Sequence, residues 1–147
     1  MEYEQIIEAV DQAQKLLIAG KVEQAHAVYA AAWDDAATRN DHYQACIVAH
    51  FMAHAQATPA AQLLWHGRAL AAATASSDER VQAFFPSLYA NLAEANLRLG
   101  DVARARLYVG HAAACAHRLP DDTYGWLIRS LIRRVDDATA KEDASFR

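Results

Sequence analysis

Four side chains that can bind metals or move protons stand at an unbroken spacing of four in the stretch HYQACIVAHFMAH. They are His42, Cys46, His50 and His54. Because residues four apart are neighbours on a helical surface, a helix in this region would place them along one side. Such a row of imidazole and thiol groups suits three kinds of chemistry: metal coordination, thiol catalysis, and ligand binding by directed polar groups.

The row lacks residues that metal coordination and thiol catalysis each require. A zinc site needs three or four converging ligands, whereas a row at spacing four drifts by about 40° per step, so that only adjacent pairs can chelate. A zinc protease would carry glutamate after the first histidine of the HxxxH pair, where this chain has Phe51. Cys46 could use His42 or His50 as a base, but no oxyanion donor or orienting carboxylate is identifiable. We therefore expect no metal, cofactor or catalytic residue, and keep a metal- or thiol-dependent site on His42, Cys46 and His50 as the alternative.

Composition excludes several classes of protein. The 147 residues suffice for one self-supporting core, and 14 Lys and Arg against 18 Asp and Glu give no basic field for nucleic acid. The stretch between Asp41 and Arg68 has no charged residue, but histidines, glutamines and Pro59 interrupt it, so a membrane span is not expected. The opening MEYEQIIEAVDQ has no signal-peptide pattern, which favours the cytoplasm, where Cys46 and Cys115 are expected as reduced thiols.

The sequence predicts an all-α protein. About a quarter of the residues are alanine, the best helix former, and no run of β-branched residues alternates with polar ones. Gly20 and Gly100 can end helices in the left-handed conformation, and Pro59 suits a first helical turn. Pro86 should either kink the helix expected at 79–99 or split off its first turn, 79–85. A single helical domain is expected over 1–140, with a frayed tail at 141–147. The expected helices are 2–18, 21–38, 41–56, 59–75, 79–99, 101–118 and 123–140.

Two segments of the chain, 16–32 and 97–113, align as repeats. The coincidences are Gly20 with Gly100, Ala25 with Ala105, Tyr29 with Val109, and Ala32 with Ala112. Upstream of the second segment, the run Tyr89, Leu92, Ala93, Asn96 has the spacing of the first helix of a tetratricopeptide repeat (TPR). The chain thus resembles the TPR family. That resemblance implies a superhelix of antiparallel helix hairpins with about seven helices, formed by three repeats and a C-terminal capping helix.

Small residues should stand where the helices cross closely, because a larger side chain would push the backbones apart. The repeat register assigns six alanines to such crossings: Ala25, Ala32, Ala61, Ala93, Ala105 and Ala112.

The resemblance to TPR proteins also implies where a ligand would bind. The first helix of each pair lines the concave face, and the family register places several polar or aromatic side chains there. These candidate ligand-binding residues are Gln14, Tyr43, His50, His54, Asn91, Glu94 and Arg98. Two alternatives without ligand binding stay open. His50 and His54 can be structural histidines, and Glu94 with Arg98 can be a solvated ion pair.

The expected function is a non-catalytic binding module that holds a protein, a peptide or a small molecule on the concave face. The metal- or thiol-dependent site is the second hypothesis. A structural homodimer is the third, because the N-terminal helix carries Ile6, Ile7 and Val10 and has no separate cap.

Overall fold

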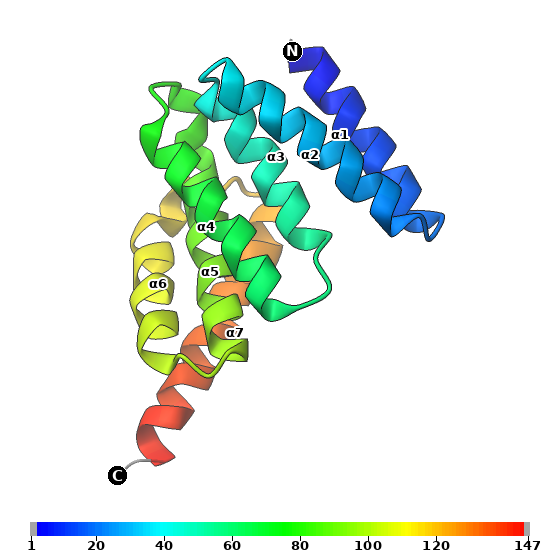
Figure 1. Ribbon diagram of the computed structural model, residues 1–147. Helices are drawn as coiled ribbons and strands as arrows, with labels where there is room; N and C mark the ends of the chain where they lie inside the picture. The colour runs from blue at the N-terminus through cyan, green and yellow to red at the C-terminus, as the bar shows by residue number, and fades with distance from the viewer. Residues whose placement is uncertain (1–2, 146–147) are drawn as a thin grey trace. The chain divides into compact units, whose positions relative to one another are not determined.

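The protein is all-helical in the computed structural model, which describes residues 3–145 (Figure 1). No strand occurs within that range, so the predicted fold class is confirmed at this level. None of the helices in residues 3–145 has both the length and the apolar character needed to cross a bilayer. The α-helices are α1 (Tyr3–Ile18), α2 (Val22–Thr38), α3 (His42–His54), α4 (Pro59–Ala75), α5 (Phe85–Arg98), α6 (Val102–Cys115) and α7 (Thr123–Ser145).

Two glycines end helices as the sequence predicts. Gly20 and Gly100 have φ of 78° and 83°, and each is followed by a backbone hydrogen bond that closes the helix end, such as the 2.8 Å bond from Lys21 N to Leu16 O. The turn between α2 and α3 uses the same device with Asn40, at φ 52°. Asparagine tolerates the left-handed conformation because its short polar side chain can bond locally.

Pro86 has the predicted effect on the fifth helical segment. A separate 3-10 helix covers Glu79–Phe84, and α5 begins at Phe85 with the proline in its first turn, where the missing N–H costs no helical bond. At the other end of the chain α7 continues to Ser145, beyond the expected end at residue 140. Residues 146–147 of the expected tail lie outside the described part of the chain.

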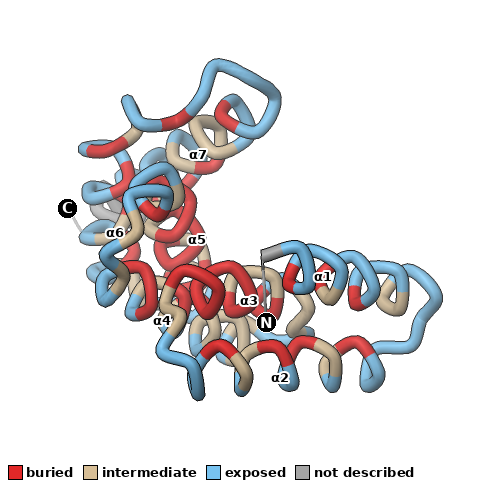
Figure 2. The backbone as a smooth tube through the Cα atoms, turned by 90° about the horizontal axis from the view of Figure 1, so that it is seen from above, coloured by how far each residue is buried: buried red, intermediate tan, exposed pale blue. Residues whose placement is uncertain are grey.

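The helices cluster into two compact units, which we describe separately: unit 1 up to Asp78 and unit 2 from Glu79. In unit 1, α1 packs on α2, α2 on α3, and α3 on α4, and α1 also contacts α3. The middle helix, α3, is buried along most of its length (Figure 2). Trp33 of α2 and Trp65 of α4 meet edge to face at 5.5 Å between ring centres.

Unit 2 repeats part of this order, with α5 on α6, α6 on α7, and α5 in contact with α7. Small residues allow close approach of α5 and α6, and larger residues of α7 close the core. Five of the six alanines predicted at helix crossings across the two units are buried at 2% exposure or less, and Ala61 is half-buried. The core of unit 2 consists of Ala90, Ala93, Val109, Ala112, Leu131 and Val135.

We expect Ala93→Leu to destabilise the protein by about 1–3 kcal/mol, because Ala93 is fully buried in this core and a larger side chain must displace its neighbours. Chemical denaturation monitored by circular dichroism measures the change. Ala113→Leu, at an exposed position of α6, serves as the control and should stay within about 0.5 kcal/mol of wild type. Equal stability of the two variants would contradict the packing of α5 on α6.

Candidate functional site

The histidine row lies on α3, and its four members differ in burial. Cys46 is 1% exposed, His50 is half-buried, and His54 is exposed at the end of the helix. Asp41 caps the helix by accepting a 3.0 Å hydrogen bond from Gln44 N. The row therefore does not present all its members to one solvent-exposed face: His42 and His50 are half-buried, and only His54 is exposed.

A third histidine, His66 of α4, joins these two. Its ring centre lies 5.2 Å from that of His54 and 6.4 Å from that of His50, and the His50 and His54 ring centres are 4.8 Å apart. We call His50, His54 and His66 the histidine cluster. Periodicity along α3 identified two of its members, but the third depends on how α3 and α4 are aligned in their hairpin.

The histidine cluster contains two buried ring nitrogens without hydrogen bonds. Nδ1 of His50 and Nδ1 of His66 are inaccessible to solvent and have no hydrogen-bond partner within the described chain. Each unsatisfied buried polar group lowers the stability of the folded protein by about 1–3 kcal/mol. A group that made the missing hydrogen bond would recover that free energy.

Burial also controls the charge of the cluster. Desolvation, reinforced by the neighbouring His54 ring, lowers the pKa of His50 to about 4 and that of His66 to about 3. Both imidazoles are therefore neutral at neutral pH, and each has one ring nitrogen with a free electron pair. Neutral imidazole is the form that binds a metal ion or accepts a hydrogen bond.

Burial keeps the thiol of Cys46 protonated and therefore unreactive. Burial raises the pKa of its thiol to about 12, so the thiolate needed by a nucleophile does not form near neutral pH. Cys46 and Cys115 are both free and buried. The environment of Cys46 is that of a small buried hydrophobic side chain.

The remaining predicted site residues of unit 1 differ in exposure. Gln14 is exposed on α1, and Tyr43 is buried at the start of α3. Beside Gln14, Ile7 and Ile18 keep 45% and 88% of their surface accessible. These three α1 residues recur at i, i+7 and i+11, so they share one side of the helix. They form an exposed stripe on α1, a helix that also contacts α3.

The predicted site residues of unit 2 lie along α5. Asn91 is 5% exposed and therefore buried. Arg98 and Glu94 form an ion pair, with 3.6 Å between a guanidinium nitrogen and a carboxylate oxygen. This is the solvent-exposed ion pair between residues i and i+4 that the spacing allowed. Such a pair stabilises a helix by about 0.3–0.5 kcal/mol.

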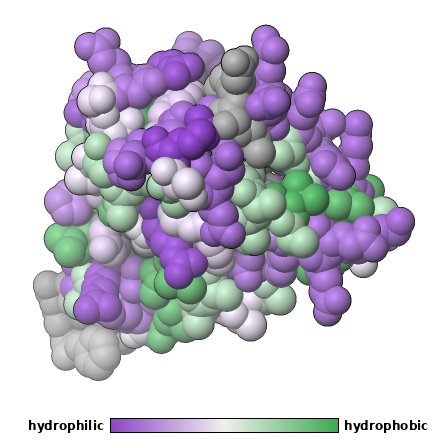
Figure 3. Space-filling view, turned by 45° about the horizontal axis from the view of Figure 1, so that its top comes forward, coloured by the Kyte–Doolittle hydropathy of each residue, from purple (hydrophilic) through white to green (hydrophobic). Residues whose placement is uncertain are grey.

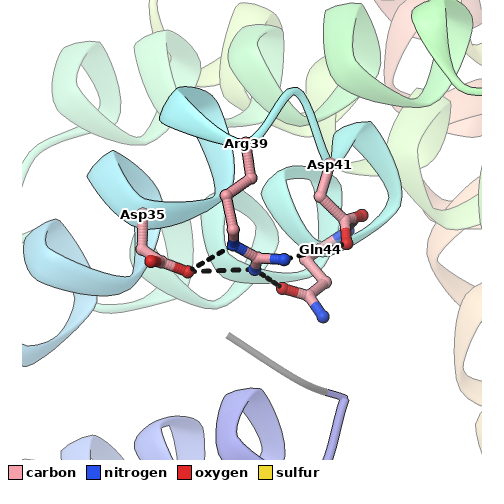
Figure 4. A network of polar contacts seen from close by, with 4 residues as sticks. All are labelled: Asp35, Arg39, Asp41 and Gln44. Carbon is pink, nitrogen blue, oxygen red and sulfur yellow. Dashed lines mark hydrogen bonds and ion pairs between the residues drawn. The ribbon is translucent and has the colours of Figure 1, made fainter.

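A pocket of about 320 Å³ in unit 1 is lined by His42 and Tyr43, which the sequence singled out, and by neighbouring residues that it did not. It lies between the α2–α3 turn and the end of α4. Its one guanidinium, Arg39, binds Asp35 at 2.9 Å and Gln44 at 2.6 Å, and stands 3.9 Å from Asp41 (Figure 4). Because two carboxylates already neutralise this charge, Arg39 stabilises the turn and offers little to an anionic ligand. The residues that line the pocket are 39–43 and 75–78.

The predicted groove residues thus divide between the units, with Gln14, Tyr43, His50 and His54 in unit 1 and Asn91, Glu94 and Arg98 in unit 2. Within residues 3–145, no group of three or more His, Cys, Asp or Glu side chains could hold a metal ion. Comparison of the chain with family models, with curated proteins and with solved structures found no match.

Proposed function

We propose that this chain is a non-catalytic binding module of the TPR type, which holds a peptide or a small molecule on the side of unit 1 formed by its first helices, α1 and α3. The order of helix contacts supports this proposal. In each unit a first helix contacts the first helix of the next hairpin, α1 with α3 and α5 with α7, in addition to its neighbours in sequence. This is the packing that makes stacked hairpins curve and gives TPR proteins a shared inner surface.

The observation that carries the proposal is the exposed stripe on α1. Ile7, Gln14 and Ile18 are exposed on the helix that packs against α3, at or beside positions where the TPR register expects ligand contacts. Figure 3 shows hydrophobic side chains at the surface on the right, the side on which the α1–α2 hairpin lies in Figure 1. Apolar anchors around an amide suit an extended peptide with apolar side chains better than a charged ligand.

The test is selection of peptide ligands from a random peptide library against the full chain, in buffer with EDTA so that metal ions play no part. Fluorescence anisotropy then gives the Kd of the selected peptides. We expect Ile18→Ser and Gln14→Ala each to weaken binding, the former by about tenfold or more, because an apolar anchor contributes about 1.5–3 kcal/mol when it is buried. Both positions are exposed, so the fold should not change.

Gln24→Ala, at an exposed position of α2, is the matched control and should leave the Kd unchanged. Selected peptides whose Kd is the same for wild type, Ile18→Ser and Gln14→Ala would contradict the proposed binding face. A second copy of the chain is the other candidate occupant, and a mass by light scattering that rises with concentration and falls back with Ile18→Ser would favour it.

A further inference from the structure

The outer face of α7 leaves two large apolar side chains in solvent. Trp126 is 64% exposed and Leu127 is 52% exposed. The inner face of the same helix supplies Leu131 and Val135 to the core of unit 2. Single exposed leucines are ordinary on a protein surface, but an indole and a leucine side by side form an apolar patch of the kind found at interfaces between proteins.

The residues that share this outer face follow a definite order of chemistry along the helix. Spacings of three, four and seven residues place Trp126, Leu127, Ser130, Arg133 and Arg134 on one side. Both arginines are exposed, and the serine between the two pairs is half-buried. From its N-terminal end the face is therefore apolar, then small, then basic.

The two ends of the face carry opposite charges. Asp121 and Asp122 are exposed just before the first turn of α7, and Lys141 is exposed in its C-terminal part. The Asp122 carboxylate accepts a 2.8 Å hydrogen bond from Gly125 N, which holds it at the start of the helix. A second α7 laid antiparallel on the first would place each acidic end beside a lysine, whereas a parallel copy would place like charges together.

From this order we propose that α7 docks antiparallel on α7 of a second copy of the chain, across a two-fold axis beside Ser130. Trp126 and Leu127 of each copy then lie against Arg133 and Arg134 of the partner subunit. A guanidinium over the face of an indole is electrostatically favourable, and the aliphatic stem of arginine covers apolar surface. The two-fold axis repeats each contact, and the small serine beside it allows the helices to approach closely.

The proposed interface is small, so the dimer should be reversible. The face between Thr123 and Asp137 is about 20 Å long and about 10 Å wide by the dimensions of a helix. This is less than a standard stable interface needs, and we expect a Kd of roughly micromolar order. Asp137, one turn beyond Arg133 on the same face, limits the repulsion between the arginines of the two copies. The dimer does not depend on the proposed peptide binding by unit 1.

The first experiment is sedimentation equilibrium of the full chain over a series of concentrations. The mass should rise with concentration from 16.2 kDa toward twice that value. A mass that stays at 16.2 kDa up to about millimolar concentration would overturn the proposal. Ile18→Ser should leave the association unchanged, because the stripe on α1 takes no part in it. Loss of the dimer in this variant would assign the interface to α1 instead.

A pair of exposed apolar positions in unit 2 then locates the interface. Trp126→Ser should weaken the dimer by about tenfold or more, since the two-fold axis removes the indole from the interface twice. Leu107→Ser is the matched control, because Leu107 is 56% exposed on α6, away from the proposed face. Circular dichroism checks that both variants are folded. An unchanged Kd in Trp126→Ser, or a weakened dimer in Leu107→Ser, would contradict the assignment.

Crosslinking tests the antiparallel orientation directly. In Ser130→Cys the two new thiols face each other near the axis, within reach of a thiol crosslinker of about 8–10 Å, the usual distance between packed helices. In Asp137→Cys they lie about 20 Å apart, because each is seven residues from the axis. We expect a crosslinked dimer from Ser130→Cys and none from Asp137→Cys or from wild type, whose Cys46 and Cys115 are buried. The reverse result would indicate a parallel pair and overturn the proposal.

Discussion

Acidification from about pH 7 to about pH 5 should destabilise the protein by about 3–4 kcal/mol, beyond what a chain without buried histidines would lose. The pKa of His50 is lowered to about 4 and that of His66 to about 3, whereas both lie near 6.5 in the unfolded chain. Their neutrality stabilises the fold fully above pH 6.5. As the pH falls, only the unfolded chain takes up these two protons, and stability is lost until the folded-state pKa values are reached.

Urea denaturation in EDTA at the two pH values measures this loss. Carboxylates stay mostly ionised above pH 5, so they contribute little within this window. His66→Leu removes one of the two titrating groups and should reduce the loss to about 2 kcal/mol. The prediction is wrong if wild type has the same free energy of unfolding at both pH values.

Gly125→Ala should be the most destabilising single methyl addition at a glycine of this chain, at about 3 kcal/mol, the upper end of the usual range for overpacking. A Cβ at Gly125 would collide with the carbonyl oxygen of Pro120. That carbonyl cannot easily retreat, because Arg129 donates hydrogen bonds to Pro120 O at 3.3 Å and to Leu119 O at 3.1 Å. The start of α7 would have to shift, and with it the 2.8 Å bond from Gly125 N to the carboxylate of Asp122.

Gly110→Ala is the matched control, with the opposite sign. Gly110 lies within α6, and a Cβ there would meet nothing within 4 Å. Alanine should therefore stabilise the protein by about 0.5–1 kcal/mol through its better helix propensity. Thermal denaturation of both variants should show Tm moving in opposite directions, and a Tm for Gly125→Ala equal to that of wild type would refute the close approach at Pro120.

The helices could be predicted closely because their ends depend on local chemistry. Gly20 and Gly100 act through backbone conformation and Pro59 through its fixed φ and missing N–H, and the structure places helix ends beside all of them. Asn40 was missed because asparagine adopts positive φ only in some contexts, so its identity alone does not mark a helix end.

The candidate site was predicted less completely, for two physical reasons. Periodicity gives the side of a helix on which a residue lies but not how deep that side is buried, so Cys46 and His54 were placed together although one is buried and the other exposed. His66 belongs to the cluster through the alignment of two helices, which depends on packing across the hairpin. No spacing within α4 carries that information.

The intrinsic fluorescence of the three tryptophans distinguishes the two units. Trp33 and Trp65 contact each other in unit 1, with the Arg68 guanidinium 4.5 Å above the Trp65 ring, whereas Trp126 in unit 2 is 64% exposed. Emission from Trp126 is therefore already close to that of a solvated indole, and the large spectral change on denaturation must come from the other two. Trp126→Phe would leave a fluorescence signal that follows the first four helices alone.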